Sequence, residues 1–293
     1  MKTLLCIALL LVQPALGKVY GDPKALKGGT FVYGMGAYPK SLLIYIGWDT
    51  ISGMIGSMVF DTLLEMDPET YDYLPRLASK WEISKDKKTF TFTLDPKAKF
   101  SDGTPVTAND VKFTFDTVLD PKNKTQAFQA LYSSIASCTV VDEHTVKFET
   151  KTNSYSNLEK LGGLYVLPKH VFSKGDFNKA FNSKLAGSGP YLLDTVDHGE
   201  KVILKRNPDY WGKDLPQNIG RYNFDKFLMK VIPDADVEFE TFKKGEIDFF
   251  TFSSAKMWST QTDSAPFKNK YVIKMKAENK YPAGLQAITW NLR

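Results

Sequence analysis

Apolar and polar residues alternate over several short stretches of the chain, which is the pattern of half-buried β-strands. In residues 89–94, Phe90, Phe92 and Leu94 alternate with threonines, so one face of this strand is predicted to be buried. A polar turn at residues 85–88 connects it to a partner strand at residues 81–84. The same pattern predicts a second hairpin at residues 139–150, which turns at Asp142–Glu143, and single strands at residues 30–33, 202–205 and 227–232.

One stretch after the first strand has the apolar spacing of an amphipathic helix. Residues 51–59 place apolar side chains at positions i, i+3, i+4, i+7 and i+8, and these are Ile51, Met54, Ile55, Met58 and Val59. Asp49 and Thr50 precede this set, and either residue type is suited to cap the first turn. A helix with its cap at one of these two positions is therefore predicted.

Two further helices are predicted from their termini. Thr107 and Asp110 form a capping-box pattern, and one side of the helix that follows carries Val111, Phe115, Val118 and Leu119. In residues 234–244, acidic residues come first and lysines last, and Gly245 follows, an order that complements the helix dipole. Hairpins combined with isolated helices indicate an α/β fold, mixed α and β, with mixed sheets.

The first seventeen residues have the parts of a secretory signal peptide. Lys2 is the positive residue, residues 4–12 are apolar, and residues 15–17 supply the small side chains of a cleavage site. The apolar run is too short to span a bilayer, which needs about 20 residues. We therefore expect residues 1–17 to be removed and the mature protein to be periplasmic.

Composition and cysteine content narrow the class of protein. With 293 residues, 43% hydrophobic and 24% charged, the chain is neither a disordered protein nor a coiled-coil rod. A net charge of +5 gives no reason to expect a nucleic-acid partner, and none is predicted. Cys6 lies within the apolar part of the leader, so a lipoprotein is not expected, and Cys138 is interpreted as a buried small hydrophobe instead of a nucleophile.

Motifs of catalysis, cofactor binding and metal binding are absent or incomplete. The three histidines are scattered, so no zinc site is predicted. Residues 187–189 are Gly-Ser-Gly, but Ala186 precludes a nucleophile elbow, and Ser84 with Lys87 matches S-x-x-K only within a predicted turn. The dinucleotide fingerprint that begins at Gly34 fails at Pro39. We predict that the chain is not an enzyme and holds no cofactor or metal.

Eight short strings of the sequence point to a known family. In order, they are G-G-T (28–30), F-D-T-L-L (60–64), L-P-R-L-A-S-K-W-E-I-S (74–84), K-F-S-D-G-T-P-V-T-A-N-D-V (99–111), G-S-G-P-Y (187–191), K-R-N-P-D-Y-W-G (205–212), I-P-D (232–234) and K-K-G-E-I-D (243–248). Together they resemble the oligopeptide- and dipeptide-binding proteins of ABC importers, extracellular solute-binding family 5. Residues 215–225 and 282–286 are similar to a subgroup that handles longer oligopeptides. Most of these residues are interpreted as turns and packing positions that mark the fold.

The resemblance implies a two-lobed architecture with a smaller domain inserted in the first lobe. Residues 18–50 and 181–293 are then the first lobe, of the type II periplasmic-binding-protein kind, and residues 51–180 are the inserted α+β domain. The family's second lobe is expected to follow residue 293, and residues 285–293 have the pattern of an interrupted strand. The chain is therefore expected to be a fragment or a truncated paralogue that lacks the second lobe and binds peptide weakly by itself.

The function implied by the resemblance is capture of oligopeptides for an ABC importer. The partners are then a peptide ligand and the importer's membrane permease, and the protein is expected to be a monomer. Three alternatives remain: a receptor of the same fold for a nickel chelate, haem or an oligosaccharide, a non-functional fragment, and a secreted peptidase. The missing catalytic motifs weigh against the peptidase.

The resemblance also implies a ligand-binding segment just before the first helix. In the family this segment offers main-chain groups to an extended peptide, and the matching positions are Gly47, Trp48, Asp49 and Thr50. Two roles are open for Trp48, namely the floor of a side-chain pocket or packing against the inserted domain. Two roles are also open for Asp49, as helix cap or as partner of a peptide's ammonium group, and the cap is favoured.

Overall fold

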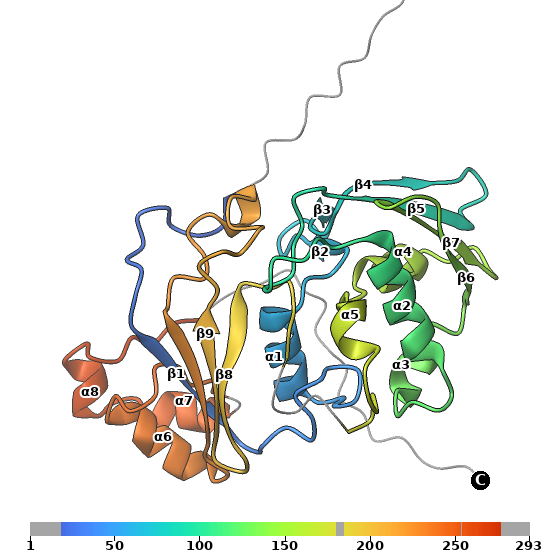
Figure 1. Cartoon of the computed structure of the whole chain (residues 1–293). Helices are drawn as coiled ribbons and strands as arrows, with labels where there is room; N and C mark the ends of the chain where they lie inside the picture. The colour runs from blue at the N-terminus through green and yellow to red at the C-terminus, as the bar shows by residue number, and fades with distance from the viewer. Residues whose placement is uncertain (1–18, 180–184, 253, 277–293) are drawn as a thin grey trace, which may run out of the picture.

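Two four-stranded sheets lie on either side of helix α1 in this computed structural model (Figure 1). The structure describes residues 19–179, 185–252 and 254–276. The predicted leader, at residues 1–17, and the strand expected at residues 285–293 lie outside the described residues. The mixed α/β class predicted from the sequence is confirmed.

The first sheet combines strands from distant parts of the chain. Its order is β1-β10-β9-β8, with β1 parallel to β10 and the other neighbours antiparallel. Thr30 lies opposite Lys226 at one end of the parallel pair, and Met35 lies opposite Val231 at the other. The strands are β1 (Thr30–Met35), β8 (Tyr191–Asp197), β9 (Lys201–Arg206) and β10 (Lys226–Val231). The three predicted single strands are confirmed, whereas β8 was not predicted.

Three helices follow the first sheet in sequence, and lie beside it in Figure 1. They are α6 (Ala235–Lys243), α7 (Ala255–Thr260) and α8 (Ala265–Lys268). The Asp234 side chain caps α6, because it accepts hydrogen bonds from the backbone N–H groups of Asp236 and Val237, both at 2.9 Å. Gly245 has a φ of +75°, a conformation in which glycine is favoured after a helix. The helix predicted from the charge order is therefore confirmed.

The second sheet consists of antiparallel strands in the order β4-β5-β7-β6. Both predicted hairpins are confirmed by β4 (Ala78–Ile83) with β5 (Thr89–Leu94), and by β6 (Ile135–Val140) with β7 (Thr145–Thr150). Phe90, Phe92 and Leu94 are each 3% exposed or less, so the predicted buried face of β5 is correct. A separate two-stranded sheet is formed by β2 (Leu64–Met66) and β3 (Tyr73–Pro75).

Helix α2 (Ala108–Leu119) packs against β6 and β7. Its predicted capping box is present, since the Asp110 carboxylate accepts from the Thr107 backbone N–H at 2.9 Å and from its hydroxyl at 2.8 Å. Cys138 lies buried in β6, and burial raises the pKa of its thiol to about 12, so the thiolate is scarce at neutral pH. The remaining short helices are α3 (Gln126–Leu131), α4 (Ser156–Gly162), α5 (Lys169–Phe172) and the 3₁₀ turn Pro216–Asn218.

Helix α1 (Thr50–Val59) packs against β8 and buries small residues beside its apolar ones. Ser52 and Gly56 are buried together with Ile55 and Val59, whereas the two methionines are only half-buried. The Ser52 hydroxyl is satisfied inside the protein because it donates to the carbonyl of Ser41 at 2.6 Å. Gly56 is buried because Ile44 packs on it, 2.9 Å from the place a Cβ would take. The helix predicted from the apolar spacing is therefore confirmed, and two positions outside that set, Ser52 and Gly56, are buried as well.

A charge network, defined here as Asp61, Arg76, Glu65 and Arg221, connects the segment after α1 with the loop between β9 and β10, and its Asp61–Arg76 pair is buried. Arg76 Nε lies 2.6 Å from Asp61 Oδ1, and Glu65 contacts both Arg76 and Arg221. Burial would lower the pKa of Arg76, but the neighbouring acidic groups, Asp61 first and Glu65 among the others, together outweigh it and hold the pKa well above its usual value. The pair is therefore charged, and it joins segments far apart in sequence.

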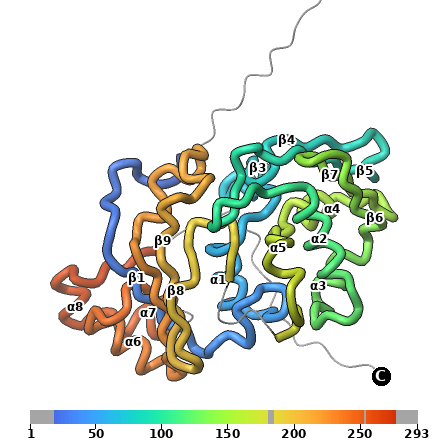
Figure 2. Tube along the Cα trace, viewed as in Figure 1, coloured from blue at the N-terminus to red at the C-terminus, as the bar shows by residue number. Residues whose placement is uncertain are grey.

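The path of the chain is visible in Figure 2, where residues 60–179 form one side of the molecule and residues 19–50 and 185–276 form most of the other. This arrangement has the connectivity of a domain inserted into a discontinuous lobe. The exact division at residues 50 and 180 remains a prediction. In the described part of the chain, no helix is long and apolar enough to cross a membrane.

Candidate functional site

The four predicted site residues lie together at the start of α1 and line one hollow. The hollow has a volume of about 430 Å³. Its lining consists of Ile44, Gly47, Trp48, Asp49, Thr50, Gly53, Phe128 and Tyr165. The sequence thus identified half of the lining. The other half includes Phe128 from α3 and Tyr165 from the segment after α4, which are distant in sequence.

The topology of the first sheet accounts for the place of this hollow. The chain leaves β1 after Met35, at the carboxyl end of the parallel pair β1 and β10, and reaches α1 through residues 36–49. In open α/β sheets, ligands bind outside the carboxyl ends of the strands. The segment that leaves the carboxyl end of β1 therefore supplies Ile44 and residues 47–49 to the lining of the hollow.

Asp49 is the N-cap of α1. Its Oδ1 accepts from the Ser52 backbone N–H at 2.9 Å. Its Oδ2 accepts from the Ser52 hydroxyl at 2.7 Å and from the Lys40 backbone N–H at 3.4 Å. Thr50 is the first helical residue. The favoured role of Asp49 as a cap is confirmed, and both carboxylate oxygens are engaged in it.

Removing this cap gives the first testable prediction. Asp49→Ala is expected to lower the free energy of unfolding by about 1 kcal/mol, because the Ser52 N–H and the Ser52 hydroxyl lose their acceptor. Asp49→Asn is expected to retain most of the stability, since asparagine caps helices nearly as well as aspartate. Urea denaturation followed by circular dichroism measures both variants. Equal losses in the two variants would show that charge, and not capping, is what Asp49 contributes.

Trp48 is held by aromatic contacts while most of its surface remains open. It is 64% exposed, and its ring meets Phe128 edge-on with centroids 4.8 Å apart. Phe128 is only 6% exposed and packs in turn against Tyr45, at 4.7 Å. The Tyr45 hydroxyl donates to the carbonyl of Tyr165 at 2.6 Å, and burial raises its pKa well above the usual value, so this donor stays protonated. Trp48 thus contacts α3 without being buried by it, and its ligand role stays a prediction.

Gly47 is required by packing, whatever its role toward a ligand. A Cβ at this position would lie 2.3 Å from the Ser52 hydroxyl oxygen and 2.7 Å from the Ser41 carbonyl oxygen. The loop therefore passes close to the first turn of α1. This close approach brings the main chain of residues 47–50 to the rim of the hollow.

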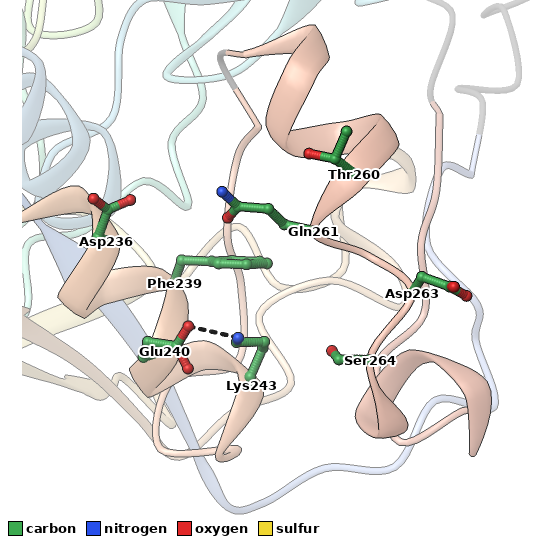
Figure 3. Close-up of a pocket in the computed structure, with 8 residues that line it drawn as sticks. All are labelled: Asp236, Phe239, Glu240, Lys243, Thr260, Gln261, Asp263 and Ser264. Atoms are coloured by element: carbon green, nitrogen blue, oxygen red, sulfur yellow. Dashed lines mark ion pairs between the residues drawn. The ribbon is translucent and has the colours of Figure 1, made fainter.

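A second hollow lies between α6 and α7 and has a different character (Figure 3). Phe239 forms its floor, and Lys243, which is 2.5 Å from Glu240, lies over the Phe239 ring. Its remaining charged side chains are the exposed carboxylates Asp236 and Asp263. Among the described residues, no group of three or more His, Cys, Asp or Glu side chains could hold a metal ion. This hollow contains none of the predicted site residues, so we take the one at α1 as the candidate site.

Comparison with known proteins identifies the family. The sequence model of the bacterial extracellular solute-binding proteins, family 5 Middle, matches residues 72–292. The chain belongs to this family. The resemblance found in the short sequence strings is thereby confirmed, and the family is one of extracellular solute-binding proteins.

Individual family members agree with this assignment. A binding protein of Brucella melitensis is 36% identical over 244 residues, covering 82% of this chain and 39% of that protein. The peptidoglycan-binding protein YepA of Agrobacterium fabrum is 30% identical over 291 residues, covering 94% of this chain and 47% of YepA. This family 5 chain thus spans less than half the length of either relative.

A solved structure supports the fold. The oligopeptide-binding protein AppA of Bacillus subtilis, determined in complex with a nonapeptide, superimposes with a TM-score of 0.69 at 27% identity. The match covers 80% of this chain and 46% of AppA. The predicted type II periplasmic-binding-protein fold is confirmed.

Proposed function

We propose that this family 5 chain serves as the peptide-capturing part of a periplasmic substrate-binding protein, which delivers peptides to the membrane permease of an ABC importer. It acts in this proposal as a monomer, without catalysis, cofactor or nucleic-acid partner, after removal of residues 1–17. Residues 18–50 and 181–293 then form the first lobe and residues 51–180 the inserted domain. Support comes from the family, from AppA, whose structure holds a nonapeptide, and from the name of YepA.

The observation that carries the proposal is the hollow at the start of α1. A peptide needs main-chain partners and separate room for its side chains. The hollow provides room lined by Trp48, Phe128 and Tyr165, next to the close-packed loop at Gly47. Asp49 is engaged in capping, so the hollow suits a side chain better than a charged terminus.

The hollow is open at its rim and is expected to bury only part of a ligand, so a low affinity is expected. Its rim residues Trp48 and Thr50 are exposed, whereas tight pockets bury about 70–90% of their ligand. We therefore expect the purified chain to bind tri- to hexapeptides in the millimolar range. Titration of a mixed peptide pool by NMR, with calorimetry for any peptide that responds, measures this binding.

The same samples test the alternatives. Peptides recovered after incubation are expected to be intact, and cleavage products would contradict a binding function. No saturable response to any peptide would contradict peptide capture. It would favour a receptor for another ligand, such as a nickel chelate, haem or an oligosaccharide, or a non-functional fragment.

A further inference from the structure

We infer that the hollow at the start of α1 selects ligands that carry an aromatic side chain, with Trp48 and Gly53 as specificity-determining residues. This inference rests on the proposed function, since it names the class of peptide that the site prefers. Its evidence is the ring geometry, the state of the only charged side chain in the lining, and the open space over Gly53.

Aromatic rings form a preformed floor of the hollow. Phe128 is fixed between Tyr45 and Tyr132, with ring centroids 4.7 Å and 6.5 Å away. Trp48 meets this fixed ring edge-on, at an interplanar angle of 84°, and keeps 64% of its surface exposed. Aromatic rings attract one another in edge-to-face and offset arrangements. A ligand ring that enters the hollow therefore contacts aromatic side chains that are already in place, and little conformational entropy is lost in positioning them.

The charge in the lining disfavours ionised side chains of a ligand. Asp49 is the only residue of the lining with a side chain that is charged at neutral pH, and its carboxylate already accepts three hydrogen bonds. A lysine or arginine of the ligand would compete with the helix cap for these oxygens. A ligand carboxylate would lie next to the negative charge of Asp49. Uncharged, apolar side chains avoid both costs.

Gly53 leaves open space in the hollow for a large ligand side chain. Gly53 lies in the first turns of α1, where glycine is a weak helix former compared with alanine. No atom lies within 4 Å of the place where its Cβ would be, so packing does not require glycine here. Gly53 lines the hollow. A Cβ is therefore accommodated at this position, and we expect a larger side chain to occupy the space in the hollow that a ligand ring needs.

The experiment uses the full chain labelled with 5-fluorotryptophan and follows it by ¹⁹F NMR. The chain has five tryptophans, and the Trp48 signal is assigned by its loss in Trp48→Phe. The probes are the N-acetyl amides of phenylalanine, alanine and lysine, which need only the hollow. We expect the phenylalanine amide to shift the Trp48 signal saturably, with an affinity about tenfold higher than that of the alanine or lysine amide.

A pair of variants tests the specificity residues. Gly53→Leu is expected to abolish the phenylalanine-amide response without lowering the melting temperature. Ser57→Leu is the matched control, because Ser57 is exposed on the same helix and lies outside the lining, and it should leave the response unchanged. Trp48→Ala is expected to weaken binding of Ala-Ala-Phe-Ala-Ala about tenfold, measured by calorimetry.

The outcomes separate this inference from the proposed function. Equal affinity for Ala-Ala-Phe-Ala-Ala and penta-alanine would overturn aromatic selection while leaving peptide capture intact. An equal response to all three amides, or an unchanged response in Gly53→Leu, would also overturn it. A selective phenylalanine-amide response without any pentapeptide binding would support the aromatic hollow and contradict peptide capture.

Discussion

Replacing Asp61 with alanine is expected to lower the free energy of unfolding by about 3–5 kcal/mol, because the buried charge of Arg76 loses its closest carboxylate and keeps only the longer contact to Glu65, at 3.3 Å. The Asp61 side chain is fully buried and that of Arg76 is 10% exposed. The Asp61 carboxylate also accepts from the Tyr210 hydroxyl at 3.0 Å and from Trp211 Nε1 at 2.8 Å. One substitution therefore removes the acceptor of three donors.

Two comparison variants identify the cause of this loss. Asp116→Ala removes the carboxylate of an exposed pair with Lys112 on α2, and its effect should stay within about 0.5 kcal/mol. The double variant Asp61→Leu and Arg76→Met replaces the buried pair by apolar groups and should recover much of the stability lost in Asp61→Ala. Urea unfolding monitored by circular dichroism gives all three values. A double variant no more stable than Asp61→Ala would show that the unpaired Arg76 charge is not the cause.

The elements that the sequence predicted correctly depend on local interactions. The alternation in residues 89–94 correctly predicted β5, and the Thr107–Asp110 capping box correctly predicted the start of α2. The Asp234 cap and Gly245 mark both ends of α6. In each case the deciding contacts lie within a few residues of one another, so the pattern is visible without the fold.

The features that were missed depend on contacts between distant segments. The buried face of α1 includes Ser52 and Gly56 because Ser41 and Ile44 of the preceding loop pack there. The candidate site gains Phe128 and Tyr165 only because the chain folds back from far along the sequence. No periodicity in the sequence relates these residues to Trp48. The signal that pointed to the site was the family resemblance, which matched residues 47–50 to a ligand-binding segment just before the first helix.

The charge network around Asp61 also depends on contacts between distant segments, which the sequence alone does not reveal. The strings F-D-T-L-L and K-R-N-P-D-Y-W-G were recognised as family markers, but the sequence does not tell that Asp61 of one contacts Tyr210 and Trp211 of the other. Their physical role is to hold the segment after α1 against the loop after β9. The candidate site lies at the start of α1, and these contacts fix the segment that follows the other end of the same helix.

Gly187→Ala is expected to lower the free energy of unfolding by about 3 kcal/mol, the upper part of the range for overpacked positions. A Cβ at Gly187 would lie 2.0 Å from the carbonyl oxygen of Val59, the last residue of α1. The neighbouring Gly189 N–H donates to this same oxygen at 2.9 Å, so the two segments are already at hydrogen-bonding distance. Because the obstacle is backbone and not a flexible side chain, α1 or the Gly187 segment has to move.

The control for this prediction is Gly36→Ala, since Gly36 is exposed and no atom lies within 4 Å of its Cβ position. Chemical denaturation should separate the two variants by more than 2 kcal/mol. Because α1 carries Trp48 and the Asp49 cap at its other end, a displacement of the helix in Gly187→Ala should also shift the ¹⁹F signal of Trp48. A Gly187→Ala protein as stable as Gly36→Ala, with an unchanged Trp48 signal, would contradict the close packing of this glycine against α1.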